Sequence, residues 1–157
     1  NHYKDKTFIK ITKKKLPFKD KEFDFVIASH VAEHVEDISF FLSELARIGK
    51  KGYIEVPTRL EDNLVFENKK AHIWHLVFDD VKNQINISKK QQYFEPVLTV
   101  GTIKKLNDYF RESLVIELNW EDTIEFNILD NDLSLSKISI LNLLKKYFSK
   151  RIRLFIK

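Results

Sequence analysis

A strand–helix–strand pattern in the first third of the chain constrains its fold most strongly. Residues 23–29 (FDFVIAS) are almost continuously apolar, which is typical of a strand covered on both faces of a parallel sheet. Residues 53–56 (YIEV) predict a second short strand that Pro57 ends. Between them Asp37 is a predicted N-cap. The apolar residues that follow recur at helical spacing: Ile38, Phe41, Leu42, Leu45 and Ile48. This order predicts a βαβ unit and an α/β fold.

Alternating patterns predict how the sheet is completed. Thr7–Thr12 (TFIKIT) alternates apolar and polar residues, as a half-exposed strand does. Leu114–Trp120 and Thr123–Leu129 also alternate and are separated by a short break, which predicts an antiparallel terminal hairpin. Two strands before the first helix are too few for a doubly wound sheet. We therefore expect a sheet that lacks its first strands.

The length predicts one domain. A chain of 157 residues builds one hydrophobic core, and we assign residues 1–157 to a single, partial domain. Residues of about 59–98 form an irregular insertion, followed by a predicted helix over 102–110 with Ile103, Leu106 and Phe110 on one face. A basic helix is predicted over about 133–157.

Charge is concentrated at the two ends of the chain. Residues 1–21 hold eight lysines against two acids, and residues 134–157 hold seven basic residues and no acid, yet the net charge is +4. The acidic centre excludes a uniformly basic nucleic-acid binder, so no nucleic-acid partner is predicted. The basic, partly apolar C-terminus predicts peripheral contact with an anionic membrane or, alternatively, a helix packed on the sheet. Without cysteines or a spanning apolar run, we expect a cytoplasmic protein.

Residues 16–58 carry a series of short motifs in a defined order. They are Leu16-Pro17-Phe18, Phe23-Asp24, Glu33-His34, Asp37, Glu44-Leu45-Ala46-Arg47 and the Gly49–Gly52 turn. This series resembles the central part of class I S-adenosylmethionine-dependent methyltransferases, in particular of the methyltransferase type 11 family. The resemblance implies a Rossmann-like sheet that ends in an antiparallel hairpin. It also implies methyl transfer from S-adenosylmethionine to a small-molecule or sugar-linked substrate.

The resemblance also implies where the cofactor and the catalytic groups lie. Thr12 and Lys13 fall at the position that contacts the adenine in this family. Ala28, Ser29 and His30 would line the methionine side of the cofactor. His34 is the first candidate for a general base, and His30 is the second.

The chain departs from the family at its beginning. The glycine-rich first turn and the acidic residue after the second strand are absent, and the chain contains no methionine. We therefore expect an N-terminally incomplete methyltransferase whose sequence begins around the third strand. The alternative is a non-catalytic Rossmann-like binding or dimerisation module that has lost the cofactor motif.

The insertion supplies the candidate substrate contacts. His72, Trp74 and His75 follow the strand that Pro57 ends, so they would overhang the mouth of the cofactor site. They are predicted to form a substrate pocket or, alternatively, to pack as the core of a small lid. Arg59 is a candidate for holding an anionic substrate group, or a solvated surface residue.

Two further features bear on metal binding and on self-association. His30 to His34 reads HxxEH, the motif of inverted zinc peptidases, but it lies between a strand and a capped helix rather than inside a helix. The methyltransferase pattern already accounts for Glu33 and His34, so no metal ligand is predicted. The unpaired edge of the predicted Thr7–Thr12 strand favours self-association, which predicts a homodimer.

Overall fold

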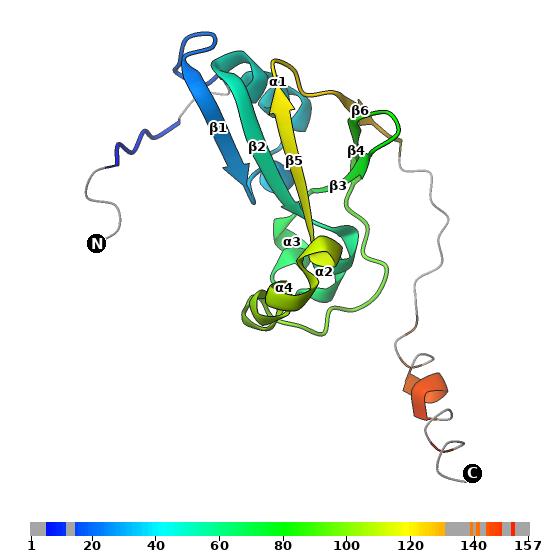
Figure 1. The fold of residues 1–157 in the computed structure, drawn as a ribbon. Coiled ribbons are helices and arrows are strands. Elements are labelled where there is room, and N and C mark those ends of the chain that lie inside the picture. The colour runs from blue at the N-terminus through cyan, green and yellow to red at the C-terminus, as the bar shows by residue number, and fades with distance from the viewer. Residues whose placement is uncertain are drawn as a thin grey trace.

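The computed structural model is a mixed α/β arrangement with two small sheets (Figure 1). In the first sheet β2 (Gly49–Pro57) lies between β1 (Phe23–Ser29) and β5 (Val115–Glu121), parallel to β1 and antiparallel to β5. The second sheet has the order β3–β4–β6. The α/β class predicted from the sequence is thereby confirmed. The structure describes residues 6–11, 15–130, 139, 141, 144–148 and 152.

Helix α1 (Ile38–Ile48) forms where the sequence predicts it. The Asp37 carboxylate accepts a hydrogen bond of 3.1 Å from the Phe40 N–H and so caps the first turn. The helix buries its apolar stripe against one face of the first sheet. Members of this core are Ile38, Leu42 and Leu45 from α1, and Ala28, Ile54 and Val56 from the sheet.

The other face of β1 differs from the prediction. We expected this strand to be covered on both faces, but Phe25 is 46% and Ile27 is 67% exposed. Successive side chains of a strand point to opposite faces, and α1 covers the face that carries Ala28. Phe25 and Ile27 therefore lie on the opposite face of the first sheet, which no element of the described residues covers at these two positions.

The insertion contains regular structure. Helices α2 (Arg59–Leu64) and α3 (Asn68–Ala71) precede a hairpin of β3 (Trp74–Asp79) and β4 (Gln84–Lys89). Figure 1 shows α2, α3 and α4 grouped beside the ends at which β1 and β2 finish. The insertion thus closes one end of the first sheet.

Helix α4 (Val100–Leu114) is longer than the predicted 102–110 segment. Ile103 is buried, but Phe110 is 57% exposed and has a non-helical φ of −131°. The prediction that Phe110 lies on one helical face with Ile103 and Leu106 is therefore wrong. The kink at Phe110 turns the last part of α4 away from the regular helical register.

The predicted terminal hairpin is also wrong. Strand β6 (Phe126–Ile128) pairs in parallel with β4 of the second sheet, while β5 pairs with β2 of the first. A single bridge between Glu121 and Thr123 joins the two runs. Ile124 is 8% exposed because it packs into the core, and this burial carries the chain from one sheet to the other.

The predicted first strand does not form in residues 7–11. No strand is assigned there, and Phe8 and Ile9 are exposed; Thr12 lies outside the described residues. A strand needs a neighbour for its backbone groups, and no described strand lies beside this segment. The homodimer stays a prediction. The strand edge from which it was predicted does not form in the described residues 7–11.

The basic C-terminal segment is described in part. Residues 144–148 are helical, as predicted for 133–157, and most of the rest of that range lies outside the described residues. None of the helices in the described parts of the chain is long and apolar enough to cross a membrane. Membrane contact through this segment stays a prediction.

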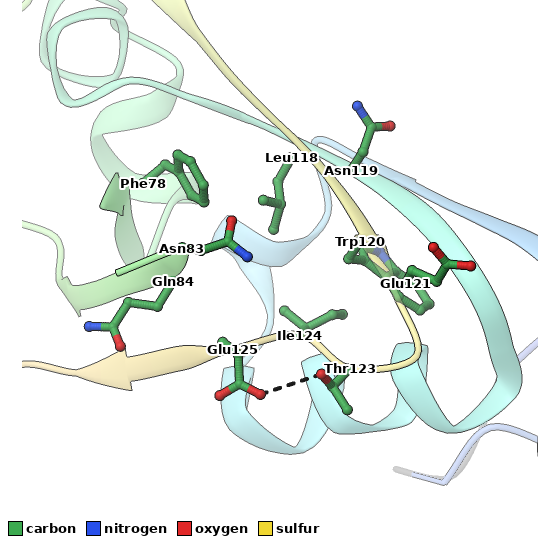
Figure 2. Close-up of a pocket in the computed structure, with 10 residues that line it drawn as sticks. All are labelled: Phe78, Asn83, Gln84, Leu118, Asn119, Trp120, Glu121, Thr123, Ile124 and Glu125. Atoms are coloured by element: carbon green, nitrogen blue, oxygen red, sulfur yellow. Dashed lines mark hydrogen bonds between the residues drawn. The ribbon is translucent and has the colours of Figure 1, made fainter. Parts of the chain in front are cut away.

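Trp120 of β5 packs on β2 and also lines a cavity beside the first sheet. It packs across Gly52 and Gly49 of β2, where a Cβ atom would meet its ring. Beside it lies a cavity of about 240 Å³ between the two sheets (Figure 2). Its lining residues come from β3, the β3–β4 turn, β4, β5 and the segment before β6: Phe78, Asn83, Gln84, Leu118, Asn119, Trp120, Glu121, Thr123, Ile124 and Glu125.

Candidate functional site

A pocket of about 180 Å³ lies beyond the carboxyl end of β1. In open α/β sheets this is the edge at which ligands bind. The turn after β1, helices α2 and α4, and the α3 region supply its walls. The lining residues are His30, Glu33, His34, Glu61, Asn68, His72, Val100, Ile103, Lys104 and Asn107. Three histidines and two carboxylates therefore face one small volume.

The turn after β1 is fixed to β2. His30 has a positive φ of 52°, and its N–H donates to the Glu55 carbonyl at 2.8 Å. The Ser29 hydroxyl donates to the Glu55 carboxylate at 2.9 Å. His30 Nδ1 lies 3.2 Å from Glu33 Oε1, and this hydrogen bond raises the pKa of His30. Ala28 is buried in the core, so Ser29 and His30 are the exposed groups of this turn.

The insertion is docked on the segment that follows this turn. The Ile73 N–H donates to the Glu33 carbonyl at 2.7 Å, and the Trp74 indole N–H donates to the Val35 carbonyl at the same distance. His34 Nδ1 lies 3.0 Å from the Ala71 carbonyl oxygen. The rings of His34 and His72 meet edge to face with their centres 4.5 Å apart. These contacts bring His72 beside the end of β1.

Helix α2 adds two buried acids. Thr58 caps the helix by accepting from the Glu61 N–H. Glu61 is 5% exposed, and burial raises the pKa of its carboxyl group, which lines the pocket. Asp62 is 1% exposed and instead contacts His72 after α3 and His75 of β3.

Three basic groups surround the Asp62 carboxylate. His72 Nδ1 lies 2.6 Å, His75 Nε2 2.7 Å and Lys90 Nζ 3.0 Å from its oxygens. The two histidine contacts are short, although the rings are not aligned as ideal hydrogen-bond donors. Burial alone would raise the pKa of Asp62, but the contacts with His72 and His75 lower it. The carboxylate therefore holds α2, α3 and the β3–β4 hairpin together as an ionised group.

The predicted substrate residues occupy different places. His72 lines the pocket. Trp74 and His75 are buried, and His75 stacks on Tyr93, so both pack within the insertion. The Arg59 guanidinium donates to the Ser88 hydroxyl at 3.2 Å.

The other predicted site residues are brought together in part. His30 and His34 line the same pocket and Ser29 directly precedes His30, whereas Thr12 and Lys13 lie outside the described residues. Sequence reasoning missed Glu61. Its place in the sequence gave no signal, because acids in the first turn of a helix are ordinary stabilising residues.

The turn after β1 fits the methionine side of S-adenosylmethionine in part. Ser29 and His30 are exposed there, and the small side chain of Ala28 allows the turn to pack closely on the core. The chain contains three glycines, at 49, 52 and 101, and none of them precedes β1. The chain therefore offers no glycine-rich turn to the rest of the cofactor.

Comparisons with known proteins agree with the sequence motifs. Residues 1–54 match the methyltransferase domain family. The ubiquinone biosynthesis O-methyltransferase of Pelagibacter ubique (strain HTCC1062) is 25% identical over 130 residues, which cover 81% of this chain and 49% of that protein. The chain thus spans about half the length of this curated relative. No solved structure matches this chain significantly. The resemblance to class I S-adenosylmethionine-dependent methyltransferases is confirmed.

Proposed function

We propose that this methyltransferase-like chain takes part in methyl transfer from S-adenosylmethionine to a small-molecule or sugar-linked acceptor. The observation that carries the proposal is the pocket beyond the carboxyl end of β1. Three of its lining residues, His30, Glu33 and His34, belong to the segment matched by the methyltransferase domain family. Open α/β sheets bind their ligands at this edge. The relative from Pelagibacter is an O-methyltransferase, which supports a hydroxyl group as the acceptor.

The chemistry divides between the cofactor and the protein. When bound, S-adenosylmethionine supplies an activated methyl group on its sulfonium. The protein has to hold the acceptor in line with that methyl group, because positioning provides most of the acceleration in such a transfer. Ser29 and His30 are the residues of this chain that would contact the cofactor.

The acceptor would lie in the pocket itself. Its polar walls, formed by His34, Glu61 and His72, suit a hydroxyl-bearing molecule. His34 is the first candidate for the group that takes the acceptor proton, because it lines the pocket and its Nδ1 faces the Ala71 carbonyl. This leaves Nε2 as the basic nitrogen. His30 is the second candidate, although its raised pKa favours the protonated form.

The proposal is tested by calorimetric titration of S-adenosylmethionine, and of S-adenosylhomocysteine, into this chain. Saturable binding that is weakened in His30→Gly supports it. Glycine tolerates the positive φ of this turn, so the variant removes the side chain without straining the backbone. Asn83→Gly is the matched control, because Asn83 also has a positive φ (50°) but lines the cavity between the sheets.

Either negative result would count against the proposal. Absence of binding would favour the non-catalytic binding or dimerisation module. Equal loss in His30→Gly and Asn83→Gly would show that the effect comes from the turn backbone in general and not from the β1 end.

A further inference from the structure

Three side chains of the pocket come together closely enough to share one ion. Glu33, His34 and His72 each offer one ligand atom, and these atoms all lie within 4.8 Å of one another. His34 Nε2 lies 4.0 Å from Glu33 Oε1. Glu33 and His34 come from the short 3-10 helix η1 (Ala32–His34), and His72 comes from the end of α3 in the insertion. The group therefore exists only when the insertion is docked.

Glu33 carries an unexplained oxygen. The side chain is 1% exposed, and its Oε1 contacts His30, but Oε2 has no hydrogen-bond partner within the described part of the chain. A buried carboxylate oxygen without a partner costs free energy unless a donor or a cation satisfies it. Glu33 lines the pocket, so a cation bound there would satisfy this oxygen.

In both histidines Nδ1 contacts an oxygen atom outside the cluster. His34 Nδ1 lies 3.0 Å from the Ala71 carbonyl, and His72 Nδ1 lies 2.6 Å from Asp62. In each ring Nε2 is therefore the nitrogen left to bind an ion. A metal-bound histidine typically directs its other ring nitrogen at a carbonyl or carboxylate, which fixes the ring and makes the bound nitrogen more basic. Here the cluster has both kinds of outer partner.

Charge in the pocket also favours a cation. Glu33 and Glu61 are both buried and both line it, and Lys104, which lines it too, is exposed. Burial and the neighbouring carboxylates raise the pKa of Glu61. His30 contacts Glu33 and compensates part of this negative charge, and a divalent cation at Glu33 would compensate more of it.

We propose that Glu33, His34 and His72 bind one divalent transition-metal ion of the zinc type, with Asp62 and the Ala71 carbonyl as outer partners. Two imidazoles and one carboxylate favour zinc and its neighbours over magnesium or calcium, which prefer all-oxygen ligands. Three protein ligands leave a fourth position for a molecule in the pocket, as in zinc sites that act on substrates.

This site differs from the HxxEH motif of zinc peptidases. In that motif two histidines one helical turn apart bind the metal, whereas here His30 hydrogen-bonds to Glu33 and the second imidazole is that of His72. The ion would bind to His34 Nε2, the nitrogen that would otherwise accept a proton. Metal binding and base catalysis by His34 therefore exclude each other.

The test is titration of Zn²⁺ into the metal-stripped chain, in the absence of S-adenosylmethionine. We expect one ion per chain, and Co²⁺ in its place should give the visible absorption of a four-coordinate site. His72→Gln and His34→Gln should each weaken binding by more than about tenfold, the lower end of what even an outer partner contributes. Thermal unfolding of each variant without metal establishes that it is folded.

His75→Gln is the matched control. His75 belongs to the same segment and contacts the same Asp62, but it offers no ligand atom to the cluster, so this variant should keep the wild-type affinity. The proposal is overturned if Zn²⁺ does not bind, or if folded His72→Gln and His34→Gln bind it as the wild type does. Because the titration contains no cofactor, its result is separate from that of the S-adenosylmethionine experiment.

Discussion

His72 Nδ1 lies 2.6 Å from Asp62 Oδ1, and this contact ties the end of α3 to α2 within the insertion. The Lys90 ammonium lies 3.0 Å from the same oxygen and also donates to the Asn68 carbonyl. Asp62 is thus the buried junction of α2, α3 and the β3–β4 hairpin. The wall of the candidate site depends on this junction, since it places the His72 ring.

Asp62→Asn should destabilise the protein by about 3–5 kcal/mol. Removal of one partner from a buried ion pair leaves the other charges uncompensated, and Lys90 and two histidines would be left around a neutral amide. Urea unfolding at neutral pH measures the change. Asp24→Asn is the matched control, because Asp24 pairs with Lys50 at an exposed position and its loss should leave the midpoint unchanged. Equal effects of the two substitutions would contradict this account of Asp62.

Arg47→Lys should cost about 1.5–3 kcal/mol, the range for hydrogen bonds to charged groups. The guanidinium donates to both Glu44 oxygens, to the carbonyls of Leu16 and Phe18, and to the Asp20 carboxylate. A lysine ammonium does not reproduce this planar set of donors. Urea unfolding checks the loss, and Arg111→Lys, at a 47% exposed guanidinium, should cost less. A larger loss at Arg111 would refute the prediction.

Stability should fall in acid partly through Glu44. Its hydrogen bond with Arg47 lowers the pKa of the Glu44 carboxyl below the usual 4.5, against the opposing effect of burial. The folded-state pKa is depressed, so this contribution is present above pH 4.5 and is lost as the pH falls through the lower folded value. The free energy of unfolding of Glu44→Gln should therefore decline less steeply than that of the wild type below pH 4.5. Glu36→Gln, at an exposed position, should keep the wild-type profile; a profile for Glu44→Gln that matches it would argue against the prediction.

Gly52→Ala should destabilise the first sheet by about 1–3 kcal/mol, because it forces a methyl group into a filled space. Its Cβ would meet the Val26 carbonyl and would lie 2.6 Å from the Trp120 ring. Gly101→Ala is the opposite case. The nearest atom would be the Thr99 hydroxyl oxygen at 3.9 Å, so alanine in α4 should stabilise by up to about 1 kcal/mol. Thermal unfolding of the two variants should thus move in opposite directions, and a shift in the same direction would count against this explanation.

Local patterns predicted the βαβ unit well. The Asp37 cap, the stripe of α1 and the parallel pairing of β1 with β2 each depend on residues close in sequence. The terminal hairpin failed because two alternating runs do not reveal which strand each will pair with. Here β5 pairs with β2 and β6 pairs with β4, and the buried Ile124 lies between the two strands in the sequence.

The candidate site was predictable only where it follows β1. The resemblance to methyltransferases pointed to His30 and His34, and both follow a strand whose carboxyl end is a ligand-binding edge. Glu61 and the pairing of His72 with Asp62 depend on how the insertion folds back onto that strand. Such contacts join segments with no shared periodicity, so no spacing rule detects them.

The free edge of β1 has a consequence for hydrogen exchange. In the described structure β1 has β2 as its single neighbour, so along the strand every second amide hydrogen faces β2 and the others face away from it. Amide protection factors along residues 23–29 should therefore alternate, slow and fast. Any molecule or chain segment that pairs with this edge would convert the alternating pattern into uniform protection.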